Sequence, residues 1–386
     1  MKRPRPFALV VASLAALAAE ALGNAAASPL ERWHAMAGDY AVLQRFVPQS
    51  ATTWWAIVAS NLKPKSFVVQ TTDSGRHWRA VTPPVKLVSS SAFLGRDEAW
   101  LEGGALFPSR TAPLYRTVDG GRTWRRLGSV PSECQLDFVD ERHGWCISIG
   151  AATGSETVRL LRTVDGGSTW TLVSRTGLYD ARSMPGALPY RCDKTLAFTS
   201  PRVGWAASYC GGGTPYLYAS RDGGARWHAL APVPLPRGLP TAPAGEGLSL
   251  PAVSGSRLAL SVEIGGSRHG ATAIATSASS GRTWRTRLVP GPLRYWKVDL
   301  IDIRHWRLSD GTTLLATDDA GRHWRRSTYA VRMKDSVGAT LALDFLSPRL
   351  GFAVPDANAG PLWWTHDGGA TWRPVKITAG PFTLPR

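Results

Sequence analysis

The fold of this 386-residue chain is decided by an eight-residue stretch that reads TVDGGSTW from Thr163 to Trp170. Its pattern is Ser or Thr, any residue, Asp, any residue, Gly, two further residues and Trp. Five other stretches follow this pattern, and they end at Trp78, Trp124, Trp227, Trp324 and Trp372. A sixth, which ends at Trp284, has Ser279 in place of the Asp. Successive copies lie 40 to 57 residues apart, which is close to the length of one four-stranded propeller blade. The repeat therefore predicts seven blades.

The third position of the repeat is expected to stabilise a turn. It holds Asp73, Asp119, Asp165, Asp222, Ser279, Asp319 and Asp367. A carboxylate there can accept hydrogen bonds from the backbone amides of its own turn, and the Ser or Thr at the first position can do the same more weakly. The final Trp supplies a large apolar surface between sheets. This structural role accounts for all seven positions, and no copy has the ligand density of a calcium loop.

A second motif lies upstream of most copies of the first and recurs with them. It reads FVDERHGW from Phe138 to Trp145, FTSPRVGW from Phe198 to Trp205 and FLSPRLGF from Phe345 to Phe352, with looser versions at 93–100 and 46–55. Short alternating runs and frequent turn residues indicate strands throughout, and no sustained helical period follows the N-terminal region. We therefore predict an all-β chain, a seven-bladed β-propeller of four-stranded antiparallel blades. The segment 39–46 is expected to lie beside the last blade.

The N-terminus has the pattern of a secretory signal peptide. Lys2, Arg3 and Arg5 precede an apolar run over 7–19, and an Ala-rich cleavage site follows at 25–27. The run is shorter than the roughly 20 residues that a membrane span needs. We expect residues 1–27 to be cleaved, residues 28–386 to form a single propeller domain without a transmembrane span, and the protein to be secreted or periplasmic.

Four cysteines fit an exported chain, because an even count there favours disulfides. They are Cys134, Cys146, Cys192 and Cys210. If Phe198 faces Gly204 across a hairpin, the same register places Cys192 opposite Cys210. In the preceding blade that register places Cys134 opposite Ser148, so a bond to Cys146 needs a register shift or a bulge. The predicted pairs are 192–210 and 134–146.

The eight-residue repeat resembles the Asp-box, also called the bacterial neuraminidase repeat. Together with the Phe…Gly-Trp motif, the unit is most similar to that of the photosystem II assembly and stability factor family, over roughly residues 38–378. The resemblance implies a seven-bladed propeller that acts as a scaffold for an acidic partner. It does not imply the photosystem itself, and it is specific for architecture rather than for function.

The charge of the chain favours an anionic partner. Lys and Arg number 45 and Asp and Glu 28, giving a net charge of +17. Export argues against nucleic acid, so the expected partner is an acidic protein or an anionic glycan of the envelope or extracellular space. Basic and aromatic residues collect in the variable loops, on the face opposite the repeated turns. They are Arg110, Tyr179, Arg182, Arg191, Arg237, Arg268, His269, Arg294, Tyr295, Trp296, Arg332 and Lys334. Either they converge on a binding surface or they are merely solvated.

Enzyme motifs are missing from the sequence. A glycosidase needs two carboxylates across a cleft, whereas Glu102, Glu156, Glu246 and Glu263 are scattered. There is no Arg-Ile-Pro element of the sialidases before the first repeat, and no hydrolase, zinc-protease or P-loop motif. We expect no catalytic residue, no metal and no cofactor. The favoured interpretation is an exported, monomeric, non-catalytic scaffold or assembly factor that binds protein. The alternative is a carbohydrate-active protein, either a glycan-binding lectin or a divergent sialidase-like glycosidase.

Overall fold

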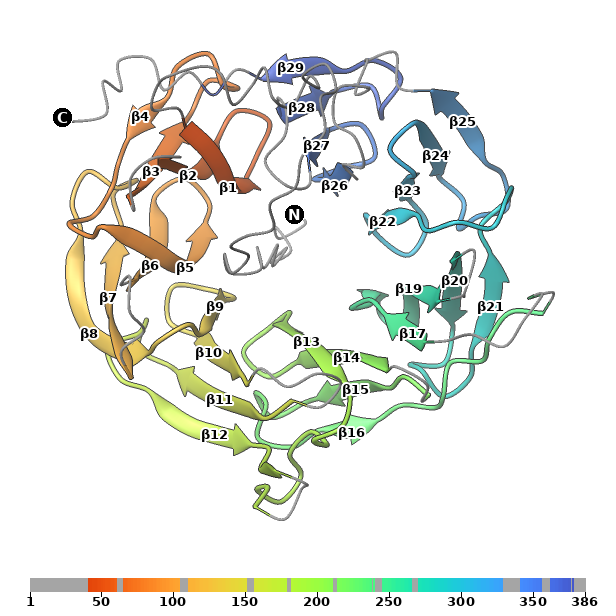
Figure 1. The fold of residues 1–386 in the computed structure, drawn as a ribbon, viewed down its shortest axis with the longest axis horizontal. Coiled ribbons are helices and arrows are strands. Elements are labelled where there is room, and N and C mark those ends of the chain that lie inside the picture. Colours follow the sequence, from red (N-terminus) through yellow and green to blue (C-terminus); the bar gives the residue numbers. More distant parts are fainter. Residues whose placement is uncertain are drawn as a thin grey trace, which may run out of the picture.

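A computed structural model describes residues 41–60, 65–104, 110–150, 156–178, 182–210, 214–237, 239, 245–265, 270–328, 341–355, 362–375 and 377. In these residues the assigned elements are all strands, β1 to β29. Figure 1 shows them as blades arranged in a ring, with the first strand of each blade innermost and the last outermost. The predicted all-β, seven-bladed propeller is confirmed. The proposed signal peptide, residues 1–27, lies outside the described residues.

The first three blades are regular four-stranded antiparallel sheets. Blade 1 consists of β1 (Ala41–Pro48), β2 (Trp54–Ser60), β3 (Ser66–Thr71) and β4 (Arg79–Ala80). Blade 2 consists of β5 (Leu87–Leu94), β6 (Glu98–Gly104), β7 (Thr111–Thr117) and β8 (Arg125–Pro131). Blade 3 consists of β9 (Gln135–Phe138), β10 (Gly144–Ile149), β11 (Val158–Thr163) and β12 (Thr171–Arg175).

The last two blades are also four-stranded. Blade 6 consists of β22 (Lys297–Leu300), β23 (Trp306–Ser309), β24 (Thr313–Thr317) and β25 (Arg325–Thr328). Blade 7 consists of β26 (Leu341–Phe345), β27 (Gly351–Pro355), β28 (Leu362–Thr365) and β29 (Arg373–Val375).

Blades 4 and 5 share one nine-stranded sheet. Blade 4 consists of β13 (Asp193–Phe198), β14 (Gly204–Cys210), β15 (Leu217–Ser220) and β16 (His228–Ala229). Blade 5 consists of β17 (Gly245–Leu248), β18 (Ala252–Ser254), β19 (Arg257–Gly265), β20 (Ala271–Ser277) and β21 (Arg285–Leu288). Both β17 and β18 pair with β19, and β17 also pairs with β14. The inner strand of blade 5 is thus split in two, and Pro251, which lacks an N–H donor, stands at the break.

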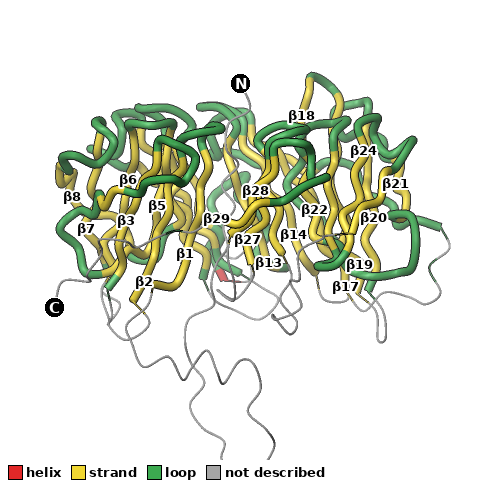
Figure 2. Tube along the Cα trace, turned by 90° about the horizontal axis from the view of Figure 1, so that it is seen from above, coloured by secondary structure: helices red, strands yellow, loops and turns green. Residues whose placement is uncertain are grey.

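All seven repeated turns join the third strand of a blade to its fourth. We call the face of the disc that carries them, together with the first hairpin turns, the turn face. The opposite face holds the connections between second and third strands and those between blades, and we call it the loop face. Figure 2 shows the disc edge-on, with the strands running from one face to the other. No helix among the described residues is long and apolar enough to cross a membrane.

Neighbouring blades are joined by an indole clamp. Trp100 of β6 stacks on Phe138 of β9, with ring centroids 3.9 Å apart, and Trp145 of β10 stacks on Phe198 of β13 at 3.6 Å. Each indole N–H also donates to a repeated turn of the next blade, Trp100 to the carbonyl of Gly166 at 2.8 Å and Trp145 to that of Gly223 at 2.9 Å. One side chain therefore fixes both the distance between two neighbouring sheets and their relative position along the strand direction.

The glycine before the clamping indole makes room for the phenylalanine across the hairpin. A Cβ at Gly144 would lie 2.5 Å from the ring of Phe138. Blade 6 reverses this arrangement, because Trp306 stands at the glycine position opposite the smaller Leu300. Arg307 then takes the place of the indole. It is 1% exposed, lies over the ring of Phe345 and donates to the carbonyl of Pro348 at 2.7 Å.

The ring closes by side-chain packing between blades 1 and 7. Strand β1 is hydrogen-bonded to β2 within its own blade, but Phe46 lies against Phe352 of β27, with ring centroids 5.1 Å apart. Trp54 of β2 contacts the same Phe352 edge-on, also at 5.1 Å. The N-terminal strand thus lies beside the last blade, as expected. Within the described residues, β26 to β29 form their sheet without a strand from the N-terminus.

Both predicted disulfides are present. Cys192 and Cys210 have Cα atoms 4.8 Å apart, and the register of β13 on β14 is the one expected from Phe198 and Gly204. Cys134 and Cys146 have Cα atoms 5.3 Å apart. The ladder of β9 on β10 contains no register shift. Instead Cys134 lies just before β9, after a turn in which Glu133 has a φ of 60°, so it reaches Cys146 from outside the ladder.

Replacing the ring-closing phenylalanine tests this account of closure. The side chain of Phe352 is 0% exposed, and Phe352→Ala is expected to lower the free energy of unfolding by about 3–5 kcal/mol, because the cavity cannot collapse between two fixed sheets. Urea unfolding followed by tryptophan fluorescence measures the loss. Val118→Ala, at a side chain that is 61% exposed, is the control. A loss below about 1 kcal/mol for Phe352→Ala would show that these contacts do not hold the ring.

Candidate functional site

The repeated turn is held by a fixed set of hydrogen bonds, seen here in blade 3. The Thr163 hydroxyl accepts the amides of Asp165 at 3.3 Å and Gly167 at 2.8 Å, and donates to Asp165 Oδ1 at 2.8 Å. The carboxylate of Asp165 in turn accepts the amide of Thr169 at 2.9 Å and its hydroxyl at 2.6 Å. These bonds, those from Thr169 foremost, lower the pKa of Asp165 to about 2.

In the other blades too, the side chain at the third position of the repeat accepts a hydrogen bond from the backbone amide of the seventh residue. In blades 1 and 6 a histidine ring replaces the threonine hydroxyl, with Nδ1 of His77 and of His323 each 2.6 Å from the carboxylate. In blade 5 the hydroxyl of Ser279 accepts the amide of Thr283 at 2.9 Å, without a charge. Among the residues that the structure describes, no group of three or more acidic, His or Cys side chains could hold a metal ion. The turn carboxylates act on their own backbone rather than on a ligand.

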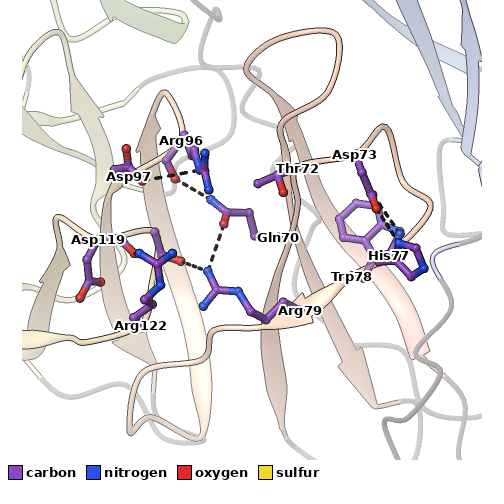
Figure 3. A pocket seen from close by; sticks show the side chains of 11 residues that line it. Gln70, Thr72, Asp73, His77, Trp78, Arg79, Arg96, Asp97, Asp119 and Arg122 are labelled. Carbon is purple, nitrogen blue, oxygen red and sulfur yellow. Dashed lines mark hydrogen bonds and ion pairs between the residues drawn. The ribbon is translucent and has the colours of Figure 1, made fainter.

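A shallow groove of about 340 Å³ lies on the turn face between blades 1 and 2 (Figure 3). Gln70 lies in the middle of it, donating to the carbonyl of Arg96 at 2.6 Å and accepting from Arg79 at 3.3 Å. Arg79 also donates to the carbonyl of Gly120 at 2.7 Å. A second hollow, of about 500 Å³, lies between blades 2 and 3 and is lined in part by Glu98, Asp140 and His143. In the first groove much of the hydrogen-bonding capacity is already used internally.

The sequence placed its candidate site on the opposite, loop face. Five of the twelve candidate residues lie outside the described residues: Tyr179, Arg268, His269, Arg332 and Lys334. Four others are exposed: Arg110, Arg182, Arg191 and Arg237. Trp296 is only 4% exposed and packs in the core between blades 5 and 6, so its ring is not a ligand contact. Its neighbours Arg294 and Tyr295 remain accessible.

Arg294 and Tyr295 form a fixed group at the junction of blades 5 and 6. The Arg294 guanidinium is paired with Asp310, whose side chain is 4% exposed while that of Arg294 is 40% exposed. Tyr295 is 53% exposed. Its ring covers Gly270, where a Cβ would lie 2.0–2.5 Å from the ring carbons. The glycine is therefore required for the tyrosine ring to lie across the backbone.

A second exposed tyrosine was missed by the sequence analysis. Tyr209 is 47% exposed, and it faces Gly247 across the β14–β17 pair, where a Cβ would lie 2.8 Å from its ring. This pairing joins two blades, and nothing local to Tyr209 in the sequence predicts it. Nearby in blade 4, Arg191 lies over the ring of Tyr216, whose hydroxyl donates to the Arg191 carbonyl at 2.8 Å. No described contact links these groups to Arg110, Arg182 or Arg237.

Carboxylates also lie toward the loop face, and one of them is fully buried. Glu102, one of the four scattered carboxylates of the sequence, is part of β6 and is 0% exposed. Burial raises its pKa to about 7, against hydrogen bonds from the amides of Glu133 and Cys134 that favour the charged form. Burial likewise raises the pKa of Asp137 to about 7. The Asp137 side chain accepts the amide of Phe198, at 2.8 Å, in the next blade. Buried as they are, these groups support the framework and cannot reach a substrate.

Comparisons with known proteins show the fold. No family model matches the chain, and no curated protein matches it. Similar solved structures include a prolyl endopeptidase (TM-score 0.55, 11% identity, covering 86% of this chain and 49% of that one). An ulvan lyase of polysaccharide lyase family PL25 has a TM-score of 0.51 and 11% identity over 86% of this chain and 96% of the lyase. A GH74 enzyme from Niastella koreensis has a TM-score of 0.49 and 14% identity over 87% of this chain and 52% of the enzyme.

This chain spans about half the length of the endopeptidase and of the GH74 enzyme. At 11% identity the likenesses to the endopeptidase and to the lyase show the fold alone and nothing about a ligand.

The hydrogen bonds of the repeated turn predict that two substitutions of Asp165 lower the free energy of unfolding by different amounts. Asp165→Ala leaves the Thr169 amide and hydroxyl without their acceptor and is expected to cost about 1–2 kcal/mol of unfolding free energy. Asp165→Ser is expected to cost less, because Ser279 already makes the same backbone bond in blade 5. Urea unfolding of both variants beside the wild type measures the order. Equal stability of all three proteins would contradict a stabilising role for this carboxylate.

Burial of Glu102 predicts a pH dependence with a definite sign. Between its ordinary pKa of 4.5 and its folded value of about 7, the folded protein keeps a proton that the unfolded chain releases. The wild type therefore loses stability as pH rises from about 5 to 8, by at most about 3 kcal/mol from this group. Glu102→Gln keeps an acceptor for both amides and does not titrate, so its stability curve should be flatter.

Thermal unfolding of the wild type and Glu102→Gln at pH 5, 6, 7 and 8 measures this difference. Glu263→Gln, at an exposed carboxylate on β19, is the control and should run parallel to the wild type. Parallel curves for the wild type and Glu102→Gln would mean that Glu102 is ionised in the folded protein throughout this range.

Proposed function

We propose that this propeller binds a negatively charged glycan on its loop face, without chemistry. The observation that carries the proposal is the pair of exposed tyrosines, Tyr209 and Tyr295, each packed against a glycine and both at the edges of blade 5. Exposed aromatic rings supported from behind offer apolar surface to a ligand, and a tyrosine adds a polar hydroxyl at its edge. The apolar face of a sugar ring fits such a surface.

The charge beside the rings favours an acidic sugar. Arg294, which precedes Tyr295 in the sequence, is held by Asp310 and keeps two-fifths of its side chain exposed. Arginine binds carboxylate and sulfate groups with two parallel hydrogen bonds, and a guanidinium that is already oriented loses less entropy on binding. Arg182, Arg191 and Arg237 add exposed positive charge on the same face. The residues predicted from sequence at 179, 268, 269, 332 and 334 lie outside the described residues and are not used in this proposal.

The comparisons favour a glycan over a protein partner. The ulvan lyase, which shares the fold at a TM-score of 0.51, was also solved bound to -[GlcA(1-4)Rha3S]-, an anionic saccharide. The resemblance of the turns to Asp-boxes and of the whole unit to the photosystem II assembly factors instead suggests an acidic protein segment as the partner. That scaffold function is the second candidate, and the experiment below separates the two.

The engagement of Asp310 and the burial of Glu102 support binding rather than hydrolysis. A glycosidase needs two accessible carboxylates across a cleft. Asp310 is engaged with Arg294 and 4% exposed, and Glu102 is fully buried. The two disulfides fit an oxidising compartment, which supports the proposed export of the chain, with residues 1–27 as a signal peptide.

A glycan array carrying neutral, carboxylated and sulfated saccharides tests the proposal on the disulfide-bonded protein, beside poly-glutamate as an acidic polypeptide. We expect retention on acidic glycans, weakened about tenfold by Tyr295→Ala, since one stacked ring is worth about 1–1.5 kcal/mol. Gly270→Ala, which displaces Tyr295 without removing it, should weaken binding similarly. Leu178→Ala, at a side chain that is 58% exposed, is the control.

Three outcomes are decisive. Retention of poly-glutamate alone would replace the glycan by a protein partner. Conversion of a bound glycan to shorter products would show an enzyme. Equal binding by the wild type and Tyr295→Ala would show that the loop face around Tyr295 is not the binding surface.

A further inference from the structure

The outermost strands of the blades carry positive charge and no negative charge. The fourth strands, β4, β8, β12, β16, β21, β25 and β29, contain nine arginines and no Asp or Glu. The third strands, to which they pair, also contain no Asp or Glu. The fourth-strand arginines, all exposed, are Arg79, Arg125, Arg126, Arg175, Arg285, Arg287, Arg325, Arg326 and Arg373. We call this set the rim arginines.

Most rim arginines have no counter-charge in the protein. Arg325 pairs with Asp318 at 2.6 Å, and Arg79 donates to Gln70 and Gly120. Within the described part of the chain, the other seven side chains form no ion pair or hydrogen bond. The carboxylates of the described residues lie elsewhere, mostly in the turns, where they bind their own backbone, and on inner strands. The rim is therefore a basic surface that the fold itself does not neutralise.

Two exposed arginines face each other directly across one of the rim sheets. Arg159 of β11 is opposite Arg175 of β12. Arg116 of β7 is opposite Arg125 of β8, but it is 15% exposed and already paired with Glu98 at 3.2 Å. Like charges at such positions destabilise a sheet. Charges on an exposed edge also protect the sheet from pairing with another chain. An anion placed between the guanidiniums of Arg159 and Arg175 would remove their repulsion.

The distribution around the disc decides the shape of the ligand. Rim arginines occur in every blade except blade 4, whose fourth strand is His228–Ala229, and Figure 1 shows these strands following the whole circumference. A flat membrane can touch such a rim along one side only. A flexible polymer with an anionic group on each unit can follow it across several blades. The residues are arginines, which suit planar carboxylate and sulfate groups better than lysines do.

We propose that the rim arginines are a second, extended binding surface for a flexible anionic polysaccharide, which crosses several blades along the outer strands. This surface is distinct from the loop-face site and shares with it only the chemical class of the ligand. Each contact is weak and screened by salt, so binding depends on the number of blades that one chain spans.

The test compares three variants, each of which removes three positive charges. The rim variant is Arg126→Gln/Arg287→Gln/Arg326→Gln. The control, Arg122→Gln/Arg282→Gln/Arg322→Gln, changes exposed arginines of the repeated turns in the same blades 2, 5 and 6. The loop-face variant is Arg182→Gln/Arg191→Gln/Arg237→Gln. The probes are long-chain dextran sulfate, a sulfated tetrasaccharide and vesicles of phosphatidylglycerol, each measured at 50 and 200 mM salt, with circular dichroism to verify folding.

We expect the rim variant to bind long dextran sulfate about tenfold more weakly than the wild type, with a shallower salt dependence, and to bind the tetrasaccharide unchanged. The turn-face control should match the wild type on all probes. Equal weakening by the rim and turn-face variants would mean that net charge alone matters and would overturn the inference. The inference would also be overturned if the rim variant lost binding to vesicles while its binding to dextran sulfate was unchanged.

A loop-face variant that loses the tetrasaccharide while the rim variant keeps the long chain would leave the proposed function standing and would refute the rim surface. The reverse result would retain the rim surface and would count against the loop-face site.

Discussion

Blades 1 to 4 of this propeller are located against one another by an indole of one blade that stacks on the first-strand ring of the next. Trp100 and Trp145 each make that contact and, with the same ring, donate a hydrogen bond to the repeated turn of the neighbouring blade. A sheet that packs on a sheet can slide, but an indole held at its face and at its N–H cannot. The turn carboxylates matter for this reason, because they hold the accepting carbonyl where the indole needs it.

The architecture could be predicted from sequence because the motif of one blade occurs seven times along the chain. The number of repeated turns predicted the number of blades, and the register of Phe198 opposite Gly204 predicted one disulfide. What failed were features that involve two blades at once. The sequence near Trp306 does not predict that Arg307 takes the place of an indole. The sequence near Tyr209 does not predict that its ring packs on Gly247. In both cases the partners come together only when the ring of blades forms. Trp296 was misjudged for the same reason, since an aromatic residue in a long connection can turn inward to fill the gap between blades.

Charge is segregated by strand position. Carboxylates are used in turns and on inner strands, where backbone amides or buried arginines engage them, whereas the third and fourth strands carry arginine without acid. The positive charge of the whole chain, which sequence alone could only connect with some anionic partner, thus has a location. The two supported tyrosines are on the loop face and the unpaired arginines follow the rim. Neither surface is built around the groove of Figure 3, where the polar groups mostly satisfy one another.

The most direct measurement of the central claim is hydrogen–deuterium exchange of the disulfide-bonded protein, with and without a saturating sulfated polysaccharide. The account predicts slower exchange at the ends of β14, β17 and β20 on the loop face and along the outer strands, with no change in the seven repeated turns. Protection confined to the turn face, or centred on the groove between blades 1 and 2, would contradict it.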